Sequence, residues 1–180
     1  GHVPFGVITK KNLKELSRYQ VIILPNVLRL SREEADAIKD YVVAGGSVYA
    51  SKYTLKSKLS EMLDATFMGE TREKSTYIAP TPEGKAILPE ITEEYPLSIS
   101  DSQIKAELSS KDGVMATITL PYTSPDDQTE FISIPSNPPG IPTDYPALIY
   151  KEFGKGKVIW SSAPIETYAI KSLKHRSIFT

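Results

Sequence analysis

The chain has 180 residues and a nearly balanced charge, 21 Lys and Arg against 22 Asp and Glu, so its formal net charge is −1. This length fits one domain, and without a basic surplus we expect no nucleic-acid partner. The sequence has no cysteine and only two histidines, which removes disulfides, thiolate nucleophiles and a histidine-rich metal site. We therefore expect no metal and no cofactor. No apolar run approaches the roughly 20 residues of a membrane span, so we expect no membrane partner.

The first third of the chain alternates between strand and helix patterns. Val3–Thr9 is a short β-prone run, and Asn12–Tyr19 has leucines at helical spacing. Val21–Leu24 is an uninterrupted apolar stretch that Pro25 stops. Such a run predicts a strand buried on both faces of a parallel sheet.

The next helix has a clear beginning and end. Ser31 and Glu34 form a capping-box pattern, apolar residues follow at helical spacing, and Gly45-Gly46 ends the helix. Ser47–Ala50 then reads as a strand and Thr54–Leu63 as a further helix. Strands and helices joined by such short connections predict βαβ crossovers in an α/β fold.

The pattern changes after about residue 66, where helical periodicity fades and proline becomes frequent. Seven of the 14 prolines fall between residues 121 and 146. We interpret residues 67–145 as a β-rich insertion within a single domain that spans residues 1–180. Its candidate strands are Ser75–Ala79, Ile104–Leu108, Val114–Leu120 and Glu130–Ile134.

The C-terminal part returns to a readable pattern. Ala147–Phe153 and Lys157–Ser162 flank a three-residue connection rich in glycine, which predicts a β-hairpin. Pro164 is suited to open a final helix through Glu166–Leu173, because a proline in the first turn gives up no hydrogen bond.

Four segments together carry a family resemblance: Tyr19–Asn26, Leu30–Ala35, Tyr41–Val48 and Gly154–Ile159. In this order and spacing they resemble the class I glutamine amidotransferase-like domain of multidomain glycoside hydrolases, as in the β-galactosidase trimerisation domain of family 42. The resemblance implies a flavodoxin-like fold, with a doubly wound, mainly parallel sheet beside a catalytic TIM barrel. It also implies that the chain is a fragment of a larger protein.

One feature of that family is missing at the start of the chain. The family opens with a strand and a helix ahead of the segment that Val3–Thr9 matches. Either the sheet lacks a central strand or the sequence begins late, and the residues do not decide between these two.

The resemblance also implies where chemistry would take place. A working amidotransferase of this fold has a cysteine on a sharp strand-to-helix turn, with a histidine and a glutamate late in the chain. Here the turn has Ser51 and Lys52, and Glu166 remains in the late segment without a histidine before it. We therefore expect a degenerate site at Ser51, Lys52 and Glu166 that has lost amidotransferase activity.

Paired carboxylates are the signature of glycoside hydrolysis, and three pairs are available. Helix capping explains Glu33-Glu34, whereas Glu93-Glu94 and Asp126-Asp127 lie in polar, loop-like stretches. A catalytic TIM barrel needs about 200 residues or more, and this chain is too short to form one.

The function that we expect is a non-catalytic structural or assembly module of a glycoside hydrolase. Its partner would be the catalytic domain of the same polypeptide or a second subunit of a homo-oligomer. The first alternative is a carbohydrate-binding module with Tyr122 and Tyr145 stacked on sugar rings, although aromatic residues in this half are more typical of core packing. The second alternative is a serine-dependent hydrolase acting through Ser51. The sequence leaves open whether the protein is cytoplasmic or secreted with its parent.

Overall fold

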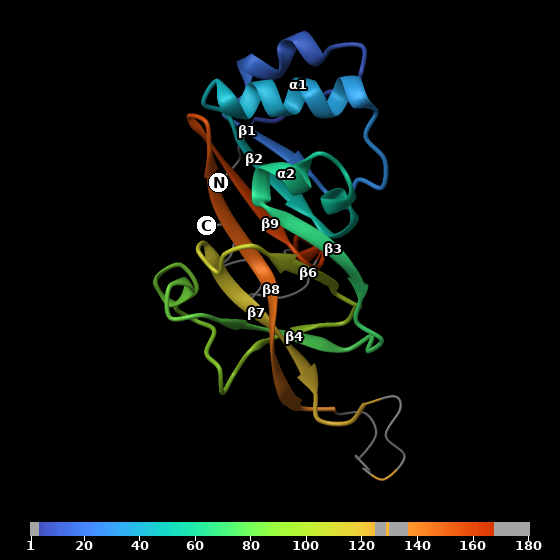
Figure 1. The fold of residues 1–180 in the computed structure, drawn as a ribbon, viewed down its shortest axis with the longest axis vertical. Coiled ribbons are helices and arrows are strands. Elements are labelled where there is room, and N and C mark those ends of the chain that lie inside the picture. Colours follow the sequence, from blue (N-terminus) through green and yellow to red (C-terminus); the bar gives the residue numbers. More distant parts are fainter. Residues whose placement is uncertain (1–3, 125–128, 130–136, 168–180) are drawn as a thin grey trace.

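The computed structural model of the chain describes residues 4–124, 129 and 137–167. Among these residues, seven strands form one mixed sheet in the order β1-β2-β9-β8-β7-β4-β5, and β3 and β6 form a separate ribbon. The sheet has two parts of different character, which we call the parallel corner and the antiparallel lobe. Figure 1 shows the corner at one end of the molecule, beneath α1, and the lobe toward the other end.

The parallel corner contains β1 (Val21–Leu24), β2 (Ser47–Ser51) and β9 (Gly156–Ser161). β2 lies between the other two strands and pairs with both of them in parallel. The helix α1 (Arg32–Val43) connects β1 to β2, so the predicted βαβ unit is confirmed.

The capping box at the start of α1 is also confirmed. The Ser31 hydroxyl accepts a hydrogen bond from the Glu34 N–H at 3.2 Å, and the Glu34 carboxylate accepts one from the Ser31 N–H at 2.8 Å. This reciprocal pair satisfies two backbone donors that a helix N-terminus otherwise leaves unpaired. At the other end of the helix, Gly45 adopts a φ of 119°, which side chains disfavour.

Three short helices join α1 around the parallel strands: η1 (Leu13–Arg18), η2 (Lys52–Lys56) and α2 (Leu59–Leu63). Their apolar side chains form one core with the inward residues of the strands, among them Val48, Val158 and Trp160. In the described part of the chain these helices cover one face of the parallel strands. On the opposite face, Val21 and Ile23 are 54% and 62% exposed.

The antiparallel lobe contains β8 (Pro139–Phe153), β7 (Val114–Pro121), β4 (Thr76–Pro80) and β5 (Leu97–Ile99), with the short helix η3 (Gly84–Ala86) beside them. β8 is shared by both parts of the sheet. Residues 139–149 of β8 pair with β7, and residues 148–153 pair with β9. One long strand therefore connects the corner to the lobe (Figure 1).

The ribbon of β3 (Ala65–Glu70) and β6 (Ile104–Leu108) completes the core of the corner, to which it contributes Ala65, Ile104 and Ala106. A second core fills the lobe. Ile149 belongs to the first core and its neighbour Leu148 to the second. Because successive residues of a strand point to opposite faces, the two cores lie on opposite faces of β8 at residues 148–150.

The predicted fold class was wrong. A flavodoxin-like, doubly wound fold needs a mainly parallel sheet with helices on both faces. Here only β1, β2 and β9 are parallel, and β8, β7, β4 and β5 pair in antiparallel fashion. Pairing in the second half of the chain comes from hairpins and long strands, which leave no room for crossover helices.

Several individual elements also differ from the prediction. The described part of the Val3–Thr9 run, Pro4–Thr9, is not a strand, because its backbone joins no ladder. The helix predicted at Thr54–Leu63 is divided into η2 and α2. Ile104–Leu108 is a strand with the predicted bounds. The strand predicted at Glu130–Ile134 and most of the final predicted helix lie outside the described residues.

Candidate functional site

The candidate site lies where the three parallel strands end. The chain turns sharply after β1 at Asn26 and after β2 at Lys52, and both residues adopt left-handed backbone conformations, with φ of 47° and 46°. Beyond β9, the short helix η4 (Ile165–Thr167) returns to the same edge of the sheet. The carboxyl ends of parallel strands are the usual place for a ligand site in α/β proteins.

Ser51 is the last residue of β2, and its side chain is fully buried. Its hydroxyl accepts a hydrogen bond from the Asn26 N–H at 2.9 Å and donates one to Glu166 Oε1 at 2.7 Å. The structure thus brings together two of the three predicted site residues, Ser51 and Glu166. The hydroxyl has a carboxylate acceptor, but a side chain with no exposed surface presents nothing to a substrate.

Tyr49 is a third member of this cluster, and sequence reasoning did not find it. Its hydroxyl donates a hydrogen bond to Glu166 Oε2 at 2.6 Å, so each carboxylate oxygen of Glu166 accepts one hydroxyl from β2. Burial raises the pKa of Tyr49, and the neighbouring Glu166 carboxylate raises it further. Tyr49 therefore stays protonated and keeps donating its hydrogen bond.

Lys52, the third predicted site residue, occupies the sharp turn itself but points elsewhere. Its ammonium lies 2.9 Å from Asp101 Oδ2, and its side chain is only 9% exposed. Its carbonyl accepts a hydrogen bond from the Trp160 indole N–H at 3.1 Å. A left-handed backbone at a non-glycine residue is strained, and these two contacts hold Lys52 in place. Ser51 and Lys52 bind different partners, so the structure does not assemble a Ser–Lys pair.

The Lys52 ion pair extends into a polar network that reaches the ribbon. The Ser102 hydroxyl donates a hydrogen bond to Glu70 Oε2 at 3.0 Å, next to Asp101. The amide of the fully buried Gln103 donates hydrogen bonds to Thr76 Oγ1 and to the Tyr77 carbonyl, both at 3.0 Å. These contacts join the turn after β2 to β3 and β4. In the sequence, the one hint of this polar network is the Asp101-Ser102 pair, which is typical of a turn.

The predicted aromatic residues are partly exposed but are not brought together. Tyr122 is 50% exposed and follows β7, where its backbone packs against Gly140 of β8. Tyr145 lies five positions beyond Gly140 on the same strand, roughly 17 Å away at the rise of an extended chain. Tyr145 is 38% exposed, with the Lys105 ammonium 5.6 Å from its ring centre. The two rings therefore do not form one stacking platform.

The described residues also bear on metal binding and on membrane insertion. Within the described ranges, no group of three Asp, Glu or His side chains is placed to hold a metal ion. Over the same residues, no helix combines the length and the apolar character needed to cross a membrane. Of the carboxylate pairs, Glu93 and Glu94 border a cleft of about 450 Å³ in the lobe, and Asp126-Asp127 lies outside the described residues.

Comparisons with solved structures find this fold in regions of several glycoside hydrolases and in smaller proteins. No family model and no curated protein sequence matches the chain. Solved structures do match. A β-galactosidase from Rahnella sp. R3 has a TM-score of 0.57 and 19% identity, over 82% of this chain and 20% of its own. An α-L-fucosidase from Paenibacillus thiaminolyticus has a TM-score of 0.64 and 21% identity, over 91% and 24%.

A smaller protein has the fold as well. A cytoplasmic protein from Salmonella typhimurium has a TM-score of 0.65 and 13% identity, and the match covers 96% of this chain and 74% of that protein. The chain spans only about a fifth to a quarter of the two hydrolases above. At these identities the likeness is one of fold. The predicted resemblance to a domain of glycoside hydrolases is confirmed in fold alone, and the trimerisation-domain fold is not confirmed.

Proposed function

We propose that this chain is a non-catalytic accessory domain of a glycoside hydrolase, which packs against the catalytic domain or against a second subunit. The observation that carries the proposal is the closed cluster at the end of β2. Ser51 is fully buried, and its hydroxyl is held between the Asn26 N–H and the Glu166 carboxylate. The polar groups at the carboxyl ends of the parallel strands, where α/β proteins usually have a ligand site, thus serve here to join η4 to β2.

The structural neighbours support the same proposal. The matched region is a minor part of the β-galactosidase and of the α-L-fucosidase, far below their full length. A chain of 180 residues is also too short for a (β/α)8 catalytic barrel, which needs about 200 residues or more. A rigid sheet that has lost its reactive groups retains a surface, and stable association would bury about 800 Å² on each partner.

Activity assays test the non-catalytic part of the proposal. The purified chain is incubated with nitrophenyl glycosides, acyl esters and glutamine, and we expect no turnover of any of them. Ser51→Ala is compared with Ser161→Ala, because Ser161 is the register partner of Ser51, is equally buried, and has a hydroxyl without a described hydrogen bond. Turnover that Ser51→Ala abolishes and Ser161→Ala retains would establish the serine hydrolase instead.

Association is tested by light scattering and hydrogen exchange on this chain and on a longer polypeptide that carries it. We expect assembly, or slower exchange of surface amides when the neighbouring domain is present. A longer polypeptide that is monomeric and leaves the exchange of this domain unchanged would contradict an assembly role.

Carbohydrate binding is a second candidate, favoured by the cleft in the lobe. Prolines, threonines and the carboxylates of Glu93 and Glu94 line this cleft together with Gly140, and Gly140 packs against Tyr122. Apolar walls with a few hydrogen-bonding groups suit a sugar ring. Binding to a glycan array that Tyr122→Ala and Glu94→Gln weaken, and Tyr145→Ala leaves unchanged, would place the sugar in this cleft. Equal loss in all three variants would argue for nonspecific adhesion.

A further inference from the structure

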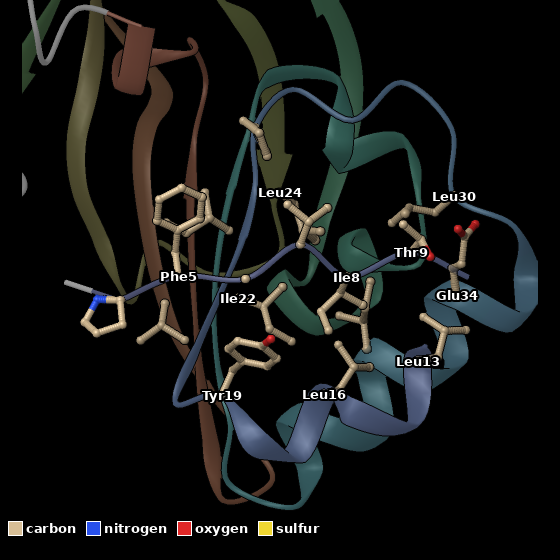
Figure 2. A pocket seen from close by; sticks show the side chains of 17 residues that line it. Phe5, Ile8, Thr9, Leu13, Leu16, Tyr19, Ile22, Leu24, Leu30 and Glu34 are labelled. Carbon is tan, nitrogen blue, oxygen red and sulfur yellow. The ribbon is translucent and has the colours of Figure 1, made fainter. Parts of the chain in front are cut away.

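An apolar pocket of about 600 Å³ runs along the outer edge of β1 (Figure 2). All four residues of β1 line one side of the pocket, and Pro4–Thr9 lines the other. Leucines from the elements underneath close the pocket, and Figure 2 shows Leu13, Leu16 and Leu30 pointing into it. We call this space the edge slot.

Among the described residues, no strand pairs with the side of β1 that borders the edge slot. β1 is the outermost strand of the sheet, with β2 as its one neighbour among the described residues. The Gln20 carbonyl accepts a hydrogen bond from the Ser47 N–H at 3.1 Å. Since parallel strands alternate the side to which successive residues bond, the N–H and C=O groups of Val21 and Ile23 point into the slot. No described backbone hydrogen bond joins them to Pro4–Thr9.

The apolar side chains that border the slot are also exposed, although such side chains are normally buried. Val21 and Ile23 are more than half exposed, and on the far side Phe5 and Val7 are 91% and 74% exposed. Long apolar edges with free backbone groups are templates for strand pairing, and proteins normally cover them. The carboxylate of Glu34 at one end of the slot is already bonded to the Ser31 N–H. The slot is therefore suited to an apolar occupant and not to a charged group or to water.

The shape of the slot selects its occupant. A lipid chain would fill the apolar volume but would leave the four outward groups of Val21 and Ile23 unpaired. A second copy would present the edge of a whole sheet, and Pro4–Thr9 closes the side from which such an edge would approach. One extended chain has N–H and C=O groups at strand spacing, about 4.8 Å from its neighbour, and meets both demands.

We propose that the edge slot binds a single extended, apolar and uncharged segment of about four residues from a partner polypeptide, which adds a strand to β1. This inference does not depend on the accessory role, because no described residue pairs with the outer edge of β1 whatever the function of the domain.

A peptide with four alternating valines and isoleucines between terminal lysines serves as the probe, and binding is followed by fluorescence anisotropy. The matched control is the same peptide with alternate backbone nitrogens methylated, which keeps the side chains and removes donors. Losing one or two hydrogen bonds of about 1 kcal/mol each predicts roughly tenfold weaker binding of the control. Equal binding of both peptides would mean apolar adhesion and would overturn the proposal, as would no binding at all.

Hydrogen exchange locates the peptide within the domain. We expect slower exchange of the Val21 and Ile23 amides on binding and no change at Ile22, which already faces β2. Ile23→Pro removes one outward N–H donor without removing a bond to β2, so it should weaken binding of the peptide roughly tenfold. Ile23→Val keeps this donor and should leave the binding unchanged. If Ile23→Pro fails to fold, the exchange pattern of the unaltered chain decides. Protection of the two amides in a peptide-free dimer would place a second copy in the slot and overturn the proposal.

Discussion

The parallel corner and the antiparallel lobe solve the same packing problem in different ways. In the corner, α1, three short helices and a ribbon cover one face of three strands, and the polar groups at the strand ends are bonded to one another. In the lobe, long strands pair in antiparallel fashion, and their core forms on the opposite side of β8. Among the described residues, the corner thus keeps a face and an edge exposed at Val21 and Ile23. A partner would add most stability there.

The largest effect is expected from the core of the corner. Trp160 is fully buried, and its indole N–H donates to the Lys52 carbonyl, so Trp160→Ala should cost about 3–5 kcal/mol of unfolding free energy. Denaturant unfolding followed by circular dichroism measures this loss. Trp160→Phe keeps most of the ring and loses the hydrogen bond, so it should cost about 1–3 kcal/mol. Equal costs for the two variants would mean that the bond to the strained turn, not the packing, dominates.

The next largest effect is expected at Gln103, and it tests whether the corner and the lobe unfold together. Gln103 is fully buried and bonds to Thr76, to the Tyr77 carbonyl and to the Ser162 hydroxyl. Gln103→Leu keeps the volume but leaves buried polar groups unpaired, at about 1–3 kcal/mol each, so we expect a total cost of about 2–4 kcal/mol.

Two probes follow the Gln103→Leu variant. Fluorescence of Trp160, the single tryptophan, reports on the corner, and circular dichroism reports on the whole chain. Because β8 belongs to both parts, the two transitions should coincide in the unaltered chain. The double variant with Ser162→Ala should cost less than the sum of the single variants, since the two side chains bond to each other. Separate transitions would mean that the corner and the lobe unfold independently, and additive costs would mean that the bond between Gln103 and Ser162 contributes little.

The corner was also the part most open to prediction from sequence. The capping box, the parallel pairing of β1 and β2, and the strand at Ile104–Leu108 depend on local patterns, and the structure has all of them. β3 and β5 were not predicted. β3 has no clear alternation and pairs across a register shift, while β5 has only three residues. Such strands depend on distant partners, which periodicity does not reveal.

The candidate site was predictable only in part, for a similar reason. The family resemblance indicated Ser51, Lys52 and Glu166, and two of them meet at 2.7 Å. Nothing local indicated that Asn26 would bond to Ser51 or Asp101 to Lys52, since these pairs are 25 and 49 positions apart. The apolar run Val21–Leu24 misled in another way. It implied cover on both faces, and the described residues supply it on one.

A smaller effect is expected at the Tyr49–Glu166 contact. Tyr49→Phe removes a hydroxyl bonded to a carboxylate, which should cost about 1–2 kcal/mol at pH 7, since Glu166 keeps its bond to Ser51.

The effect of Tyr49→Phe also depends on pH. Burial raises the pKa of Tyr49 above that of an unfolded tyrosine, about 10, so its stabilising contribution is complete below pH 10 and is lost as the pH rises further. The difference between the unaltered chain and Tyr49→Phe should therefore shrink in unfolding experiments above about pH 10. A difference that stays constant up to pH 11 would mean that Tyr49 is not protected from ionisation.

The smallest effect is expected at the start of α1, in the best-predicted element of the corner. Ser31→Ala removes the cap and should cost about 1 kcal/mol, whereas Ser31→Thr should retain most of the stability. Hydrogen bonds from the Ser31 N–H and hydroxyl lower the pKa of Glu34, so the ionised carboxylate stabilises the helix above its ordinary pKa of 4.5 and loses that effect as the pH falls. Glu34→Gln keeps an acceptor without the charge. Its difference from the unaltered chain should shrink as the pH falls below 4.5 and through the lowered pKa of Glu34, and a pH-independent difference would assign the stabilisation to hydrogen bonding without the charge.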